Sequence, residues 1–170
     1  IKPEDIKFLQ AHAPEFQDRF KKRSIFRSRF EMEFGVLNDD EHPTVDSKYW
    51  QAIGEQNVHI SEFISVTNEY KKLCAEQEII EADLEELELV LEAYLNDDQT
   101  PSYQIKRQRA EIKKKQVELD QNIFGQANQQ KTAQERMKEI KNWEEIIGNL
   151  EKQGLEFGTD DFEKHHAKRY

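Results

Sequence analysis

Hydrophobic side chains recur at alternating steps of three and four residues between positions 63 and 94. Apolar residues with this spacing form one stripe along a helix, as in the seam of a coiled coil. The only polar member of the stripe is Gln77. We therefore predict a long helix over about 47–95. Its seam consists of Phe63, Val66, Tyr70, Leu73, Ile80, Leu84, Leu87, Leu91 and Tyr94.

A second heptad repeat follows this one and predicts a second long helix, over about 102–153. Its middle third, about 121–134, is rich in glutamine and contains Gly125, which makes it a candidate hinge, kink or polar contact surface. The apolar residues of the repeat are Ile105, Ile112, Leu119, Ile140 and Ile147, with Gln126 and Ala133 at the intervening positions.

The charges predict that these two helices fold back on each other. Residues 76–98 contain ten acids and no base, whereas residues 106–115 contain six bases and one acid. The segment 96–102, with Asn, Asp and Pro residues, is a turn signal between them. An antiparallel hairpin closed at this turn places Glu92 level with Lys106 and sets opposite charges beside the two seams.

The ends of the chain predict smaller helical elements. The first region holds Pro3, Pro14 and phenylalanines at helical spacing, which indicates a short helix followed by a longer one, and then a loop over 35–46. Gly154 and Gly158 precede a short C-terminal helix. We therefore divide the chain into 1–46, 47–153 and 154–170.

The predicted fold class is all-α: a long antiparallel helical hairpin with an N-terminal helical subdomain and a short C-terminal helix. Composition agrees, because 35% charged residues, 36% hydrophobic residues and a mean hydropathy of -0.97 suit long solvated helices better than a large spherical core. The β-branched alternation of strands is nearly absent, which argues against all-β and doubly wound α/β folds.

Candidate chemistry is scarce in this sequence. It contains no phosphate-binding glycine loop, no His-Glu-x-x-His and no nucleophile elbow, so we predict no enzymatic activity, no cofactor, no metal and no small-molecule substrate. Cys74 is the only cysteine, and no apolar run is long enough to span a membrane. We therefore expect no membrane partner, and a location in the cytoplasm or in a virion.

Two features allow more than one interpretation. Trp50 and Trp143 lie near the open end of the hairpin, where they either pack in one layer or serve as interface anchors. The stretch 19–29 carries bases, no acid and interleaved aromatic residues, so it either binds nucleic acid or belongs to a helix with phenylalanines in the core and cations outside. Its cations are Arg19, Lys21, Lys22, Arg23, Arg27 and Arg29.

The predicted helix 47–95 also has apolar residues away from its seam, including Val58, Ile64, Ile79 and Leu89. Two helices alone leave this second face uncovered. We therefore favour a non-enzymatic structural, assembly or adaptor protein that forms homo-oligomers or docks on a larger assembly. The alternative is an oligomeric nucleic-acid-binding protein that uses 19–29, a division of labour that resembles the small terminase subunits of tailed phages.

Overall fold

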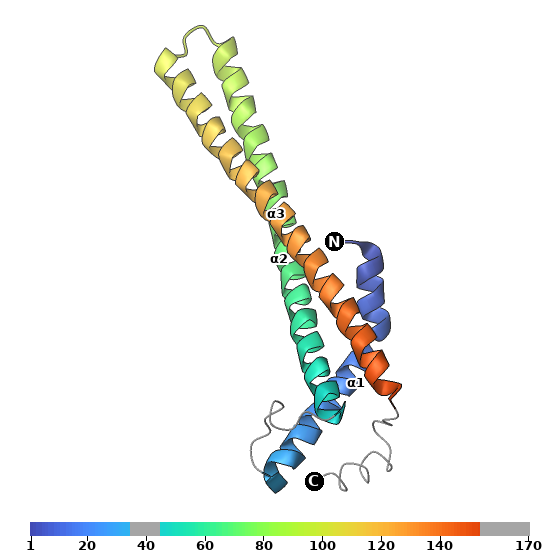
Figure 1. Ribbon diagram of the computed structural model, residues 1–170. Coiled ribbons are helices and arrows are strands. Elements are labelled where there is room, and N and C mark those ends of the chain that lie inside the picture. Colours follow the sequence, from blue (N-terminus) through green and yellow to red (C-terminus); the bar gives the residue numbers. More distant parts are fainter. Residues whose placement is uncertain (35–44, 154–170) are drawn as a thin grey trace. The chain divides into compact units, whose positions relative to one another are not determined.

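The chain was analysed as a computed structural model that describes residues 1–34 and 45–153, with side chains for 1–28 and 48–153. It contains three helices, and the described residues include no strand: α1 (Pro3–Phe34), α2 (Val45–Asn96) and α3 (Ser102–Glu151) (Figure 1). The all-α class and the antiparallel hairpin of α2 and α3 are confirmed. The C-terminal helix expected at 154–170, and most of the loop expected at 35–46, lie outside the described residues.

The first helix differs from the prediction. Residues 3–34 form one helix, not a short helix followed by a longer one, and Pro14 lies inside it. Proline has no N–H to donate to the carbonyl four residues earlier, and its ring pushes against that carbonyl, so a helix that continues through it bends. Figure 1 shows α1 as two stretches that point in different directions.

The turn between α2 and α3 is held by short-range hydrogen bonds. Asp97 Oδ1 accepts from the backbone N–H of Gln99 at 2.9 Å, and the Asp97 carbonyl accepts from the N–H of Thr100 at 3.1 Å. The Pro101 carbonyl then accepts from the N–H of Gln104, which starts α3. An aspartate that bonds the backbone two residues ahead stabilises a tight turn, which is why the helical pattern stops at the predicted position.

The described chain consists of two compact units. The three-helix unit (Ile1–Ile64 with Gln134–Tyr170) contains α1, the start of α2 and the end of α3, whereas the hairpin unit (Ser65–Ala133) contains the rest of α2 and α3 with their turn. No helix in the described part of the chain has an apolar stretch that would span a membrane.

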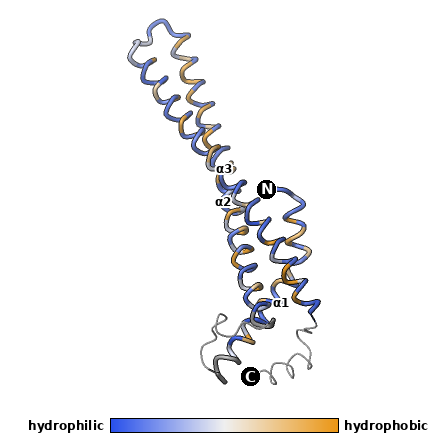
Figure 2. Tube along the Cα trace, in the orientation of Figure 1, coloured by the Kyte–Doolittle hydropathy of each residue, from blue (hydrophilic) through white to orange (hydrophobic). Residues whose placement is uncertain are grey.

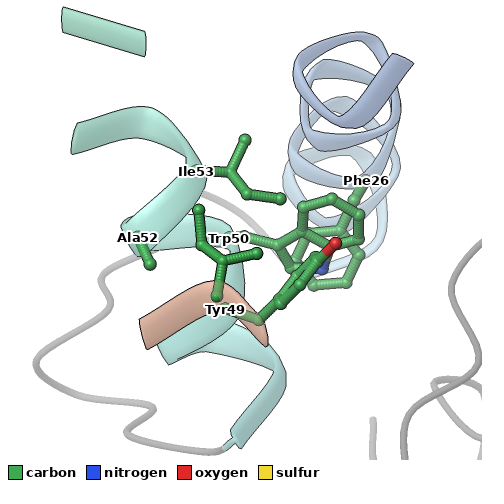
Figure 3. Packing of buried hydrophobic residues seen from close by; sticks show 6 residues of the cluster. Phe26, Tyr49, Trp50, Ala52 and Ile53 are labelled. Atoms are coloured by element: carbon green, nitrogen blue, oxygen red, sulfur yellow. The ribbon is translucent and has the colours of Figure 1, made fainter. Parts of the chain in front are cut away.

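The core of the three-helix unit is aromatic. Trp50 is buried and stacks on Phe26, with ring centroids 5.4 Å apart, and Tyr49 meets the indole edge-on at 4.9 Å (Figure 3). Ile53 and Ile147 pack in the same cluster. Trp143 packs against this cluster from α3, and Trp50, at 1% exposed, is inside the unit and away from its surface.

The hairpin unit buries little. Of its predicted seam residues, Ile80 and Leu84 are buried, while the others between Val66 and Leu119 are half-buried. Figure 2 shows apolar positions recurring along both helices, separated by hydrophilic ones. The helix continues through Gly125, where an added Cβ would lie 3.4 Å from Leu73 Cδ1. Such a Cβ would make an ordinary van der Waals contact with the leucine, and Gly125 does not end or interrupt the helix.

We predict that Ile147→Ala lowers the free energy of unfolding by about 2–5 kcal/mol, because it leaves a cavity in the aromatic core. The neighbouring Ile146 is exposed and provides a matched control, for which we expect a change within about 0.5 kcal/mol. Urea unfolding followed by circular dichroism measures both. Equal effects of the two substitutions would contradict this assignment of the core.

Candidate functional site

Two cations of the stretch 19–29, Arg19 and Arg23, bind to groups inside the three-helix unit. The Arg19 side chain is 9% exposed, and Arg19 Nη1 donates to both carboxylate oxygens of Glu144 at 2.8 and 3.0 Å. Its Nη2 donates to Glu15 at 2.6 Å and lies 3.2 Å from Glu151. Burial lowers the pKa of Arg19, but the bond to Glu144 and the surrounding carboxylates outweigh it and raise the pKa above its ordinary value. Arg19 therefore ties α1 to α3.

Arg23 has a similar inward role. Its Nε donates to the backbone carbonyl of Trp50 at 2.9 Å, and its guanidinium lies over the Phe20 ring at 5.9 Å. An added Cβ at Gly54 would come within 2.9 Å of this guanidinium, so the glycine leaves room for the arginine against α2. Within the three-helix unit, Arg19 thus binds α1 to α3, and Arg23 binds α1 to α2.

Lys21, Lys22 and Arg27 of this stretch are more exposed than Arg19. Lys22 pairs with Asp18 at 2.9 Å, one helical turn away, and Lys21 is exposed. Arg27 is half-buried and also has an interaction partner. The side chain of Arg29 lies outside the described side chains. The five cations with described side chains therefore do not form one continuous basic surface.

Around Arg19, further polar groups complete a buried network. Gln56 Nε2 donates to Glu144 at 2.8 Å and to the Ile140 carbonyl at 3.3 Å. The Tyr49 hydroxyl donates to Glu151 Oε1 at 3.1 Å. Burial and the charge of Glu151 raise the pKa of Tyr49 above its ordinary value of 10.0. Glu144 thus accepts from Arg19 of α1 and Gln56 of α2, whereas Glu151 accepts from Tyr49 of α2 and forms an ion pair with Arg19.

In the hairpin unit, amide side chains bond across the seam. Gln108 Nε2 donates to the Leu87 carbonyl at 2.9 Å, and Asn122 Nδ2 donates to the Leu73 carbonyl at 3.0 Å. Donors and acceptors are each two heptads apart, so the register between α2 and α3 is the same at both places. A helix carbonyl has a second lone pair, and an amide that uses it is satisfied while partly buried.

The glutamine-rich middle third of α3 contributes the rest of this polar interior. Gln126 Nε2 donates to Gln77 at 2.6 Å and to Asn122 at 2.7 Å, and Gln130 donates to the Tyr70 hydroxyl at 2.8 Å. The one polar seam residue of α2, Gln77, therefore meets amides of α3. Cys74 donates to Gln126 at 3.6 Å, as a half-buried free thiol.

Both helices of the hairpin unit also carry an apolar stripe on the side opposite their shared seam. In α2 the exposed side chains of Ile79 and Leu89 are 63% and 60% accessible, and in α3 that of Phe124 is 68% accessible. We name the acidic face Ala75, Ile79, Ala82, Leu89 and Ala93 of α2, with Glu86 between Ala82 and Leu89, and with the exposed Glu78, Glu85 and Glu92 at its border. The basic face is Tyr103, Ala110, Val117 and Phe124 of α3, bordered by the exposed Lys106, Arg107, Lys113 and Lys114.

Little of this charge is compensated inside the hairpin unit. Across the two helices, Lys115 pairs with Asp83 at 3.1 Å, and this bond together with Glu118 raises the pKa of Lys115. Among the described side chains no other cation of 106–115 forms an ion pair, so the expected contact of Lys106 with Glu92 is not made. Opposite charges nevertheless lie on adjacent helices, as the sequence predicted.

In the part of the chain that the structure describes, no cluster of His, Cys, Asp and Glu is placed to hold a metal ion. No protein-family model, curated protein or solved structure matches this chain. The exposed acidic and basic faces of the hairpin unit are therefore the candidate functional site.

We predict that Arg19→Met lowers the free energy of unfolding by about 3 kcal/mol, because it leaves Glu144 partly buried without its cation. Lys22→Met, which removes an exposed pair on the same helix, is the control and is expected to cost about 0–1 kcal/mol. Urea unfolding at neutral pH measures both. A similar small effect for the two variants would show that Arg19 does not hold α1 in place.

The raised pKa of Tyr49 predicts a pH dependence. The unfolded chain loses the phenol proton near pH 10.0, whereas the folded chain keeps it, so stability falls as the pH rises above this value. Tyr49→Phe removes the phenol and therefore its contribution to the pH dependence of stability. We therefore expect the difference in unfolding free energy between wild type and Tyr49→Phe to shrink from about pH 8 to about pH 11. A constant difference over this range, measured by urea unfolding, would contradict the assignment.

Proposed function

We propose that this chain is a non-enzymatic assembly protein that associates through the acidic and basic faces of its hairpin unit. The observation that supports the proposal is the apolar stripe on both helices, opposite their seam and bordered by charge. Single exposed apolar side chains are common on protein surfaces, but exposed apolar side chains that recur on one face of a helix are typical of helices that pack on a partner. The stripes lie in the unit that buries least by itself.

The alternative, nucleic-acid binding through 19–29, has weaker support. Arg19 and Arg23 make contacts inside the three-helix unit, and Lys22 pairs with Asp18. A phosphate backbone would have to compete with Glu144 for Arg19. The net charge of -10 also disfavours general attraction to nucleic acid.

We predict that the wild-type chain self-associates and that Phe124→Ser weakens association by about tenfold or more, because it removes the most exposed large apolar side chain of the basic face. Ile146→Ser is the matched control, since Ile146 is an exposed isoleucine of α3 in the three-helix unit. Sedimentation equilibrium over a concentration series measures both variants.

A wild-type chain that stays monomeric at every concentration would overturn self-association. Fluorescence anisotropy with labelled DNA and RNA tests the alternative at about 50 mM salt, where phosphate contacts are strongest. Binding there that weakens steeply with salt would favour the nucleic-acid function.

A further inference from the structure

We infer that the acidic face of one copy packs on the basic face of a second copy, in head-to-tail order. This inference rests on the proposed function and names the partner and the geometry of association. The partner is the same chain because one hairpin unit presents both halves of a complementary contact. Each half combines exposed apolar side chains with charges mainly of one sign, the acids of 78–92 on α2 and the bases of 106–114 on α3. The exceptions are Lys71 and Lys72 beside Ala75, and Asp120 between Val117 and Phe124.

Charge favours contact between unlike faces. Two acidic faces brought together would set Glu85 and Glu92 of one copy against the same residues of the other, and like charges at close range disfavour association. An acidic face on a basic face places these carboxylates beside Lys106 and Lys113, which have no ion pair within the described part of the chain.

The sizes of the side chains are complementary as well. We consider a second α2 that lies antiparallel to α3 in the register set within one chain by Asp83 and Lys115. In that register Leu89 is level with Arg109 and one residue from Ala110, and Ala75 is level with Ile123 and one residue from Phe124. A large side chain thus lies within one residue of a small one at both places, which is the condition for knobs of one helix to enter holes of the other.

The positions of the two faces determine the symmetry. The acidic face belongs to α2 and the basic face to α3, and each lies opposite the seam where these helices contact each other in the hairpin unit. The two faces of one copy therefore point away from each other and bind two different neighbours. Such heterologous contacts build a closed ring or an open array, whereas a two-fold dimer needs one surface that pairs with itself.

The experiment blocks one face at a time in the full chain. The acidic-face variant carries Ile79→Ser and Leu89→Ser, and the basic-face variant carries Val117→Ser and Phe124→Ser. All four side chains are exposed, so the fold is expected to survive, and circular dichroism verifies this. Native mass spectrometry and sedimentation velocity then count the chains in each sample.

We expect three or more chains in the wild-type particle and one chain in each variant alone. A mixture of the two variants has one intact acidic face and one intact basic face, so it is expected to form a 1:1 heterodimer that grows no further. The heterodimer should dissociate as salt is raised, because exposed ion pairs are screened.

The outcomes separate the two proposals. A monomeric wild type overturns the proposed self-association. A wild type that associates, with a mixture that stays monomeric, overturns only the head-to-tail arrangement. A wild-type dimer, or a variant that still dimerises alone, also overturns this arrangement, because either result requires an interface that pairs with itself.

Discussion

The structure depends on the register between α2 and α3. Asp97 and Pro101 fix where the chain reverses, and the seams of the two helices then face each other. Apolar side chains alone specify such a register weakly, since a shift by one heptad buries a similar set. The amides of Gln108 and Asn122 bond particular carbonyls of α2, so a shifted register would leave partly buried polar groups unsatisfied. The polar interior therefore sets the alignment, and the leucines and isoleucines provide the stability.

The three-helix unit depends on a different kind of contact, because α1 has few apolar side chains besides phenylalanine to bury. Arg19 and Arg23 supply directional contacts in their place, one to carboxylates of α3 and one to a backbone carbonyl of α2. A buried guanidinium is stabilising only if its donors are satisfied, and here Glu144, Glu15 and Glu151 accept from it or lie beside it. The contact thus fixes the position of α1 at the cost of desolvating charge.

The sequence contains enough information to predict the hairpin. Its seam, its turn and the sign of the charge on each of its two helices are local or periodic patterns. It does not show which of two helical faces a cation occupies. Arg19 and Arg23 were assigned to a basic stretch by composition, yet they follow Phe16 by three and seven residues and so share its buried face. That spacing was the available signal. The sequence marked 121–134 as a candidate polar contact surface, and Asn122 of that segment does bond across the seam. Gln108 was missed, because a search for apolar repeats passes over an amide whose role depends on a carbonyl of another helix.

At the centre of the hairpin unit, the usual distribution of polar and apolar side chains is reversed. Gln77, Asn122 and Gln126 lie between the helices, whereas Phe124 is exposed on the outside. An isolated two-helix unit gains little from this arrangement, because the apolar surface stays in water while amides occupy the shared seam. The arrangement becomes favourable when the outer stripes are covered, since the amides then specify the intramolecular register and the exposed aliphatic and aromatic side chains supply the intermolecular burial. The segregated charges give the association a direction, because one helix of each hairpin is acidic, the other is basic, and unlike helices attract each other.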